Sequence, residues 1–246
     1  MASPLRAQIT WQQYEDPTLT WGNEGDKDSP YRLFLARHLL PFIGDVTGQS
    51  VLDIGSGTGW LVHLLGQRGA TPLQGVEPSG YAKLAARHYP EATFHQLAFE
   101  DFEAPTATFD VITLIMSTEV MVAVASALKK CAKLLKPKGR VVLCKGNYAY
   151  FLADKYDYVI TREEVIPGQE AYVKTERPTG YGTTIDVYRS TQRVVEIASQ
   201  SGLAVHGKVL PFTPDAELIE AVARYRDFAD QSIMELIDFR LKPDEQ

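Results

Sequence analysis

The stretch VLDIGSGTGW at residues 51–60 places three glycines within five positions, directly after a short apolar run. Glycine adopts backbone conformations that other residues avoid, and it lets the main chain approach a ligand closely. An apolar run followed by a glycine-rich turn and a helical pattern predicts a strand that leads into the N-terminus of a helix. Such a terminus offers unpaired N–H groups and the positive end of the helix dipole. We therefore expect a ligand to bind at this turn.

Short apolar runs alternate with amphipathic segments on both sides of the glycine turn. The expected strands are 51–55, 73–77, 93–96, 110–116 and 140–145, and the expected helices between them are 58–68, 79–89 and 119–135. This alternation is typical of a doubly wound α/β fold with a mostly parallel sheet covered on both faces. Farther along, the pattern predicts a helix at 190–201, a strand at 203–210, a helix at 214–230 and a last strand in the tail MELIDFRLK.

The chain divides into four expected segments. Residues 1–47 form an N-terminal helical and loop segment with a helix beginning near Pro30, 48–146 a ligand-binding core, 147–189 an inserted cap, and 190–246 the end of the core fold. The cap has patches of period-two alternation and holds seven of the twelve tyrosines. Tyrosine is a good strand former, so a small β cap is one explanation, and a pocket lined by tyrosines is the other.

Composition limits the class of protein. The formal charge of −6 and the pI near 5.4 argue against a nonspecific nucleic-acid surface. Cys131 and Cys144 form no metal-binding pattern and lie in apolar runs, so we expect small core residues and no metal site. No apolar run approaches 18 residues, and the N-terminus has no signal-peptide core. We expect a cytoplasmic protein without a membrane partner, either a monomer or a homodimer.

Three kinds of ligand suit a glycine turn of this type. A nucleoside triphosphate is excluded because no GK[ST] follows the glycines. A dinucleotide is disfavoured because GxGxxG would need glycine where Trp60 stands, and because Asp53 would repel a pyrophosphate. A cationic ligand suits Asp53. Glu77, 18 residues after Gly59, stands where a carboxylate can accept hydrogen bonds from both ribose hydroxyls.

Four motifs together resemble the class I S-adenosylmethionine-dependent methyltransferases. They are VLDIGSGTG (51–59), GVEPS (75–79), FDVITLIM (109–116) and LLKPKGRVVL (134–143), and the resemblance covers roughly residues 48–146. It implies a Rossmann-like, seven-stranded sheet whose last strand is antiparallel, with S-adenosylmethionine as the cofactor. The tail strand expected above would fill that last place.

The resemblance also implies roles for individual residues. Asp53 would act near the methionine amine of the cofactor, directly or through water, and Glu77, followed by Pro78, would take the ribose hydroxyls. The remaining cofactor contacts fall in three groups: Gly55, Ser56, Gly57 and Gly59 beneath the methionyl group, Ala98 and Phe99 at the adenine, and Met116 and Ser117 facing the methyl-transfer centre.

The methyl acceptor is less well defined by the sequence. The exit of the fourth strand, MSTEV, lacks the [DN]PPY pattern of amine-directed nucleic-acid methyltransferases, which together with the acidic charge favours a small molecule. Glu119 is a candidate catalytic residue, or else it only places a negative charge at the N-terminus of the next helix. His38 is a second candidate, or else a histidine at the edge of the core. The candidate acceptor-binding side chains are Tyr14 and Trp21 in the N-terminal segment and Tyr148 and Tyr181 in the cap.

Two other functions remain open at this point. A protein that binds the cofactor without catalysing transfer would keep the same glycine turn and serve a regulatory role. An NAD(P)-dependent oxidoreductase would share the general layout, although Asp53 and Trp60 argue against it.

Overall fold

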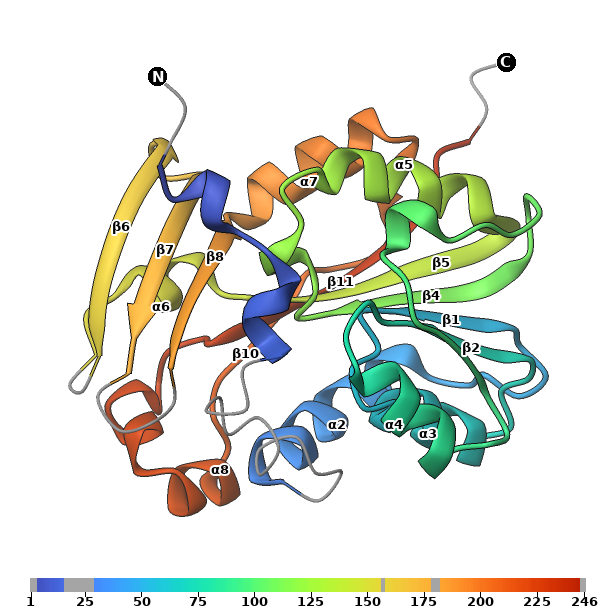
Figure 1. The fold of residues 1–246 in the computed structure, drawn as a ribbon, viewed down its shortest axis with the longest axis horizontal. Coiled ribbons are helices and arrows are strands. Elements are labelled where there is room, and N and C mark those ends of the chain that lie inside the picture. The colour runs from blue at the N-terminus through green and yellow to red at the C-terminus, as the bar shows by residue number, and fades with distance from the viewer. Residues whose placement is uncertain (1–3, 16–28, 156–157, 178–181, 244–246) are drawn as a thin grey trace.

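A mostly parallel sheet of eight strands forms the centre of the molecule (Figure 1). The computed structural model describes residues 4–15, 29–155, 158–177 and 182–243. The strand order is β10-β11-β5-β4-β1-β2-β3, and β9 also pairs with β11. The strands are β1 (Val51–Ile54), β2 (Leu73–Val76), β3 (Thr93–His95), β4 (Phe109–Ile115), β5 (Leu135–Gly146), β9 (Leu203–Val205), β10 (Leu210–Phe212) and β11 (Met234–Leu241).

The pairing pattern confirms the predicted architecture. β1 runs parallel to both β2 and β4, β4 runs parallel to β5, and the tail strand β11 is antiparallel to β5. The single strand expected at 203–210 is instead two short strands, β9 and β10, which both pair antiparallel with β11. Gly207 separates them with φ +77°, a conformation that does not continue a strand.

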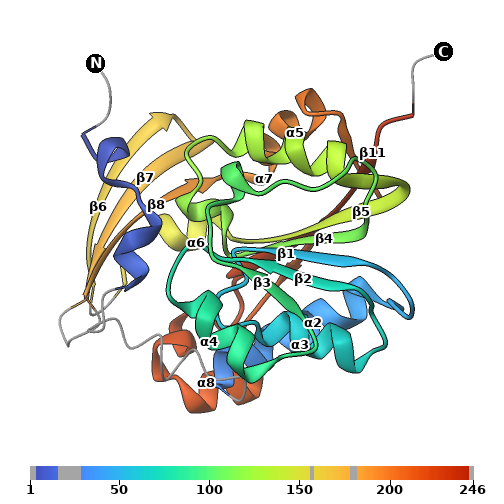
Figure 2. The ribbon, with the colours of Figure 1, turned by 45° about the vertical axis from the view of Figure 1, so that its right-hand side comes forward.

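Helices cover both faces of this sheet. In Figures 1 and 2, α5 and α7 lie on one face, and α2 and α3 lie on the other. The helices are α2 (Pro30–Ile43), α3 (Trp60–Gln67), α4 (Tyr81–His88), α5 (Val124–Leu134), α6 (Tyr148–Leu152), α7 (Thr191–Gln200) and α8 (Ala216–Ala221). Short 3₁₀ turns are η1 (Arg6–Gln8), η2 (Trp11–Glu15), η3 (Phe99–Asp101), η4 (Thr118–Val120) and η5 (Ala223–Phe228).

Local sequence signals explain where the helices begin and end. Helix α2 begins at Pro30, as predicted, and the Ser29 hydroxyl accepts a hydrogen bond from the backbone N–H of Arg32 (3.3 Å). The helix expected at 119–135 begins only at Val124, because η4 precedes it. The helix expected at 214–230 is divided into α8 and η5 by Val222, which is extended.

The core has two parts, one on each face of the sheet. One packs α5 and α7 against the strands, and the other packs α2 and α3 against the opposite face. All four residues of β1 are buried, as expected for a strand covered on both sides. Cys131 and Cys144 are both buried and have free thiols, which confirms the prediction that they are core residues.

A second, smaller sheet follows β5 in the chain. It consists of β6 (Val159–Ile166), β7 (Glu170–Glu176) and β8 (Thr183–Arg189), which pair antiparallel in that order. In Figure 1 it stands beside the carboxyl-terminal edge of the central sheet, with η2 between the two sheets. We call this three-stranded sheet the cap sheet. The division of the chain into four segments at 1–47, 48–146, 147–189 and 190–246 stays a prediction from the sequence.

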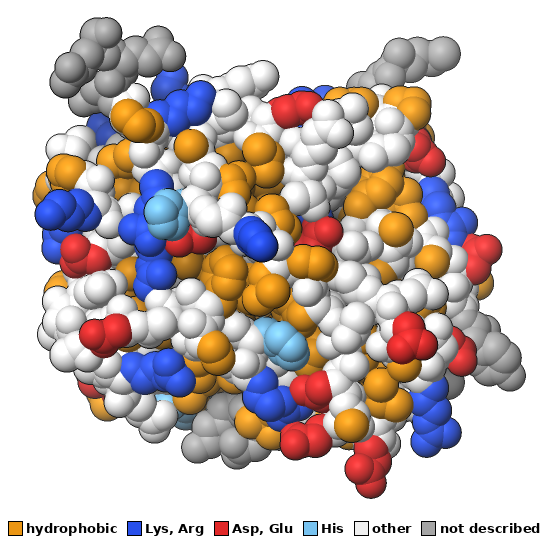
Figure 3. Space-filling model, turned by 180° about the vertical axis from the view of Figure 1, so that it is seen from behind, with side chains coloured by type: hydrophobic (Ala, Val, Ile, Leu, Met, Phe, Trp, Pro, Cys, Tyr) orange, Lys and Arg blue, Asp and Glu red, His pale blue; other side chains and the backbone are white. Residues whose placement is uncertain are grey.

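Two features of the surface bear on partners. On the face in Figure 3, basic and acidic side chains are interspersed rather than gathered into a stripe of one sign. No helix in the described part of the chain is long and apolar enough to cross a membrane.

Candidate active site

One cavity extends from the glycine turn after β1 to the cap sheet. Its volume, about 390 Å³, falls within the range of small-molecule sites. The end at the glycine turn, which we call the cofactor end, is lined by Gly55, Gly57, Thr58, Glu77, Pro78, Ala98 and Phe99. The opposite end, which we call the acceptor end, is lined by Tyr14, Glu119, Tyr150, Phe151, Lys155, Arg177, Asp186 and Tyr188, with Met116 and Ser117 also in the wall.

Two glycines give the cofactor end its shape. Gly55 has φ +74°, and a Cβ built on it would lie 2.6 Å from the Cβ of Ser117, so no larger residue fits. Gly57 has φ +51°, and a Cβ there would meet nothing within 4 Å. Since Gly57 lines the cavity, that open space is available to a ligand.

The Glu77 carboxylate braces the turn from the end of β2. Its Oε2 accepts a hydrogen bond from the backbone N–H of Gly57 (3.0 Å), and its Oε1 accepts one from the N–H of Ser79 (2.9 Å). Each carboxylate oxygen has a further lone pair, so both remain able to accept a hydroxyl donor from the cavity. Glu77 therefore has the position and the free acceptor capacity that binding two ribose hydroxyls requires.

Asp53 lies behind the wall rather than in it. Its side chain is 3% exposed, and the Thr113 hydroxyl donates to its Oδ1 over 2.6 Å. Burial raises the pKa of Asp53 to about 7, the hydrogen bond from Thr113 opposes that rise, and the charge of Glu77 adds to it. Asp53 does not line the cavity, so its effect on a ligand would be through its charge or through water.

Other residues predicted to bind the cofactor fall into two sets. Pro78, Ala98, Phe99, Met116 and Ser117 all line the cavity. Ser56 and Gly59 do not line it. Ser56 is buried, and a Cβ on Gly59 would lie 2.7 Å from the Phe94 ring, so Gly59 permits close packing of α3 on β3.

The exit of β4 is locally strained. Met116 has φ +54°, an unusual value for a residue other than glycine, and its N–H donates to the Cys144 carbonyl (2.8 Å). Ser117 follows with a buried hydroxyl that has no hydrogen-bond partner in the described structure. Ser117 lines the cavity, so this part of the wall holds a polar side chain whose hydrogen-bonding capacity is unused in the described structure.

These features fit S-adenosylmethionine. The open space above Gly57 lies in the same cavity as the Glu77 carboxylate, and Ser117 forms part of the wall. A second carboxylate, Asp53, is buried outside the cavity wall, near enough for the charge of Glu77 to raise its pKa. Two carboxylates suit a ligand that carries a sulfonium and an ammonium group and no phosphate.

Two carboxylates also mark the acceptor end. Glu119 is 4% exposed and Asp186 is 3% exposed, and both line the cavity. Burial raises the pKa of each carboxyl, and the charge of Asp186 contributes to the rise at Glu119. The Tyr14 hydroxyl donates to Asp186 Oδ1 over 2.5 Å. A carboxylate with a raised pKa is suited to accepting a proton near neutral pH.

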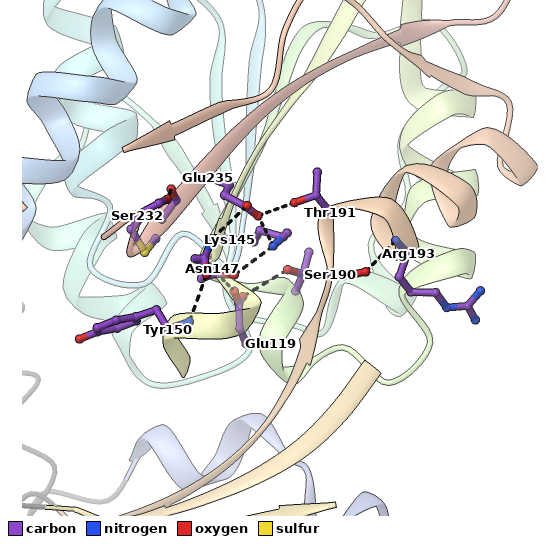
Figure 4. A network of polar contacts seen from close by, with 12 residues as sticks. Glu119, Lys145, Asn147, Tyr150, Ser190, Thr191, Arg193, Ser232 and Glu235 are labelled. Atoms are coloured by element: carbon purple, nitrogen blue, oxygen red, sulfur yellow. Dashed lines mark hydrogen bonds and ion pairs between the residues drawn. The ribbon is translucent and has the colours of Figure 1, made fainter. Parts of the chain in front are cut away.

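Glu119 is held by backbone rather than by a basic side chain. Its Oε1 accepts the N–H of Gly146 at the end of β5 (2.9 Å), and Figure 4 shows Glu119 close to Lys145 and Asn147. Behind it, Lys145 forms a buried ion pair with Glu235, which also accepts a hydrogen bond from Thr191 (2.6 Å). Lys145 is thus neutralised by Glu235, which leaves the Glu119 carboxylate facing the cavity.

The structure does not support a catalytic role for His38. Its ring stacks on Phe212 (4.3 Å between centroids), its Nδ1 lies 2.9 Å from the Phe34 carbonyl oxygen, and it does not line the cavity. The ring of His38 thus packs against β10 outside the cavity, a placement that favours the alternative of a histidine at the edge of the core.

The four predicted acceptor-binding residues have different outcomes. Tyr14 lines the cavity. Tyr148 does not line it, because it packs against the cap sheet beside Ala171, Val173 and Tyr188. Trp21 and Tyr181 lie outside the described residues. Within the described part, no group of three or more His, Cys, Asp or Glu side chains is arranged to hold a metal ion.

A family model described as a methyltransferase domain matches residues 27–166. The chain belongs to the class I S-adenosylmethionine-dependent methyltransferases. Ubiquinone biosynthesis O-methyltransferases from Sodalis glossinidius (strain morsitans) and Albidiferax ferrireducens are 33% and 32% identical to it over 134 and 176 residues. These alignments cover 52% and 65% of this chain, and they span 54% and 67% of the relatives' own lengths.

Solved structures agree on the fold. An S-adenosylmethionine-dependent methyltransferase from Mesorhizobium loti has a TM-score of 0.64 and 18% identity, and the match covers 89% of this chain and 100% of that one. The fold of this methyltransferase is therefore the Rossmann-like one that the glycine turn predicts.

The sequence did not reveal several polar residues of the methyltransferase cavity. Asp186, Lys155 and Arg177 line the acceptor end, but each is separated from the motifs by a long stretch of chain. The strand TTIDVYR contained one usable signal. Thr184, Asp186 and Tyr188 alternate with Ile185 and Val187, so a carboxylate shares one strand face with a tyrosine, and the whole strand after Thr183 is buried.

Proposed function

We propose that this methyltransferase transfers a methyl group to a hydroxyl group of a small molecule held between the central sheet and the cap sheet. The observation that carries the proposal is the continuity of one cavity from Glu77 to Asp186. A cofactor at the glycine turn and an acceptor beside the cap sheet would share this space. The O-methyltransferase names of the two relatives support oxygen as the acceptor atom.

The cofactor-end residues would hold S-adenosylmethionine, with Glu77 at the ribose, Phe99 and Ala98 at the adenine, and the glycine turn beneath the methionyl group. When bound, the cofactor supplies an electrophilic methyl group on a sulfonium sulfur. The negative charge of Asp53 behind the turn complements that cation, and the buried wall keeps water away from it.

The acceptor-end residues would position the hydroxyl and receive its proton. Asp186 is the first candidate, because Tyr14 fixes its orientation and burial raises the pKa of its carboxyl. Glu119 is the second, held by the N–H of Gly146. Positioning alone supplies much of the rate acceleration in such a displacement, and a base adds to it.

The test is an assay of turnover on a panel of phenols, carboxylic acids and amines. The formation of S-adenosylhomocysteine measures the turnover. We expect product with hydroxyl acceptors, a loss of turnover in Asp186→Asn, and an unchanged affinity of that variant for S-adenosylmethionine. Binding of S-adenosylmethionine without turnover on any acceptor would instead indicate a regulatory cofactor-binding protein.

A further inference from the structure

Three cations line the acceptor end of the cavity, and they come from three separate segments. Lys155 follows α6, Arg177 follows β7, and Arg224 lies in η5. The mechanism proposed above uses none of them. Since methyl transfer to a hydroxyl needs no cation at the acceptor, their convergence requires another explanation.

Lys155 is half-buried, and its Nζ contacts carbonyl and aromatic groups rather than a described carboxylate. Its Nζ donates to the backbone carbonyl of Tyr150 (2.7 Å) and lies 4.5 Å from the centre of that tyrosine ring and 5.5 Å from the ring of Phe151. The adjacent Asp154 pairs with Arg162 instead. Among the described residues, no carboxylate lies within ion-pair distance of Lys155. A partly desolvated ammonium that contacts only carbonyl and aromatic groups is stabilised when an anion joins it.

Arg177, which also lines the cavity, likewise contacts a neutral polar group and an aromatic ring. One of its N–H groups donates to the Thr184 hydroxyl (3.3 Å), and its guanidinium lies 5.5 Å from the centre of the Tyr158 ring. No ion pair joins Arg177 to a described carboxylate. A guanidinium has five N–H donors, and a fork of two of them matches a carboxylate or phosphate.

We propose that Lys155 and Arg177 bind the carboxylate or phosphate group of the methyl acceptor, whose apolar body packs against the aromatic wall of the cavity. The wall includes the rings of Tyr150, Phe151, Tyr188 and Tyr225. This inference rests on the proposed function, since it concerns the acceptor of that reaction. The cations then lie at the same end of the cavity as Glu119 and Asp186, so this end would offer an anion-binding group and a proton acceptor to one molecule.

The methionine carboxylate of the cofactor is the main competing ligand for these cations. A different cation, Arg32, stands at the cofactor end: its Nη1 donates to the Thr58 hydroxyl (2.8 Å), and its guanidinium lies 5.7 Å from the Trp60 ring. Arg32 thus brings positive charge to the glycine turn itself, which leaves Lys155 and Arg177 for the acceptor.

The test is calorimetry on the full chain saturated with S-adenosylhomocysteine, titrated with benzoate, phenyl phosphate and the uncharged benzamide. We expect at least one of the two anions to bind at least tenfold more tightly than benzamide. Lys155→Met and Arg177→Met should each remove most of that difference. Lys174→Met is the matched control, because Lys174 pairs with Glu176 and does not line the cavity. The preferred anion identifies the acidic group as a carboxylate or a phosphate.

The pH dependence gives a second readout. Burial, with repulsion from Arg162, Arg177 and Arg224 that Asp154 only partly offsets, lowers the pKa of Lys155 to about 8. Anion binding should therefore weaken as the pH rises through 8 in the parent protein, and this dependence should disappear in Lys155→Met, because arginine stays charged.

The proposal is overturned by two kinds of result. One concerns the three compounds: benzamide binds as tightly as both anions, or none of the three compounds binds. The other is a loss of affinity for S-adenosylhomocysteine in Lys155→Met or Arg177→Met, which would assign the cations to the cofactor. Failure of the proposed function has a different signature, since the parent protein would then transfer no methyl group to any hydroxyl acceptor, whether or not it binds the anions.

Discussion

Tyr14 and Asp186 are 172 positions apart in the chain, and their side chains meet at 2.5 Å at the acceptor end of the cavity. The neighbouring Gln13 bonds to both backbone groups of Ile185, with its Nε2 donating to the carbonyl oxygen (3.0 Å) and its Oε1 accepting from the N–H (2.7 Å). The η2 turn is therefore attached to the open edge of β8. This attachment couples the N-terminal segment to the position of a candidate base.

Removal of the Tyr14 hydroxyl should loosen this attachment. A hydrogen bond to a buried carboxylate is worth about 1.5–3 kcal/mol, so Tyr14→Phe should speed amide hydrogen exchange in Trp11–Glu15 by tenfold or more. Turnover should fall while affinity for S-adenosylmethionine is kept. Tyr148→Phe is the control, because the Tyr148 hydroxyl has no hydrogen-bond partner in the described structure. Equal exchange rates in both variants would show that the contact does not hold η2 in place.

Loss of the charge on Glu77 should weaken cofactor binding. Glu77→Gln keeps the shape but loses charge-assisted hydrogen bonds, so the Kd for S-adenosylmethionine should rise at least tenfold. Glu91→Gln is the matched control, since Glu91 is an exposed partner of His63 and does not line the cavity. Calorimetry measures the Kd for S-adenosylmethionine in the two variants. The same Kd in both would show that Glu77 does not contact the cofactor.

The two glycines of the turn should respond differently to alanine. Gly57→Ala adds a methyl group in open space, so folding should lose only about 1–2 kcal/mol from the left-handed backbone, while cofactor binding weakens strongly. Gly55→Ala forces its methyl group against Ser117, so it should lose far more stability. Denaturant unfolding and calorimetry measure the two effects. A Gly57→Ala variant with normal cofactor affinity would show that the space above Gly57 is not used.

Asp53 should make cofactor binding release protons. Its pKa of about 7 lies above that of a free aspartate, so the free protein holds a proton there below pH 7. A cationic cofactor favours the ionised form, and binding at pH 6 should therefore release a proton and should strengthen as the pH rises toward 7. Calorimetry at pH 6 in buffers of different ionisation enthalpy measures this release. Asp53→Asn should abolish it, and a buffer-independent enthalpy in the parent protein would contradict the effect.

The same pKa has a consequence for stability. Between the pKa of an unfolded aspartate and about 7, the native state binds a proton that the unfolded state does not. The contribution of Asp53 to the free energy of unfolding therefore falls as the pH rises through this range. Asp53→Asn should unfold at higher denaturant concentration than the parent protein at pH 8, where the buried charge is present.

The cofactor end of the cavity was predictable because short motifs in the sequence form it. The glycine turn, Glu77 and the exit of β4 each follow a strand, and parallel strands bring such exits to one edge of the sheet. The periodicities gave the strand and helix boundaries of 51–146 to within a few residues, with two exceptions. Helix α5 begins at Val124 rather than at 119, and β5 begins at Leu135 rather than at 140. They did not reveal the break at Gly207, because a glycine within an alternating run indicates a bulge as readily as an end.

The acceptor end was less predictable because tertiary contacts create it. Asp186 becomes a site residue only through Tyr14, and Lys155 only through the rings of α6 and the cations that face it. His38 illustrates the same limit, since helical spacing cannot distinguish a histidine packed on Phe212 from one that faces a cavity.

The most direct test of the account is a crystal structure of the full chain with S-adenosylhomocysteine. We expect the nucleoside in the cavity at the glycine turn, with the ribose hydroxyls in hydrogen-bond contact with Glu77, the adenine against Phe99, and the sulfur directed toward Asp186. A cavity that stays empty at saturating ligand, or a nucleoside bound elsewhere on the protein, would contradict it.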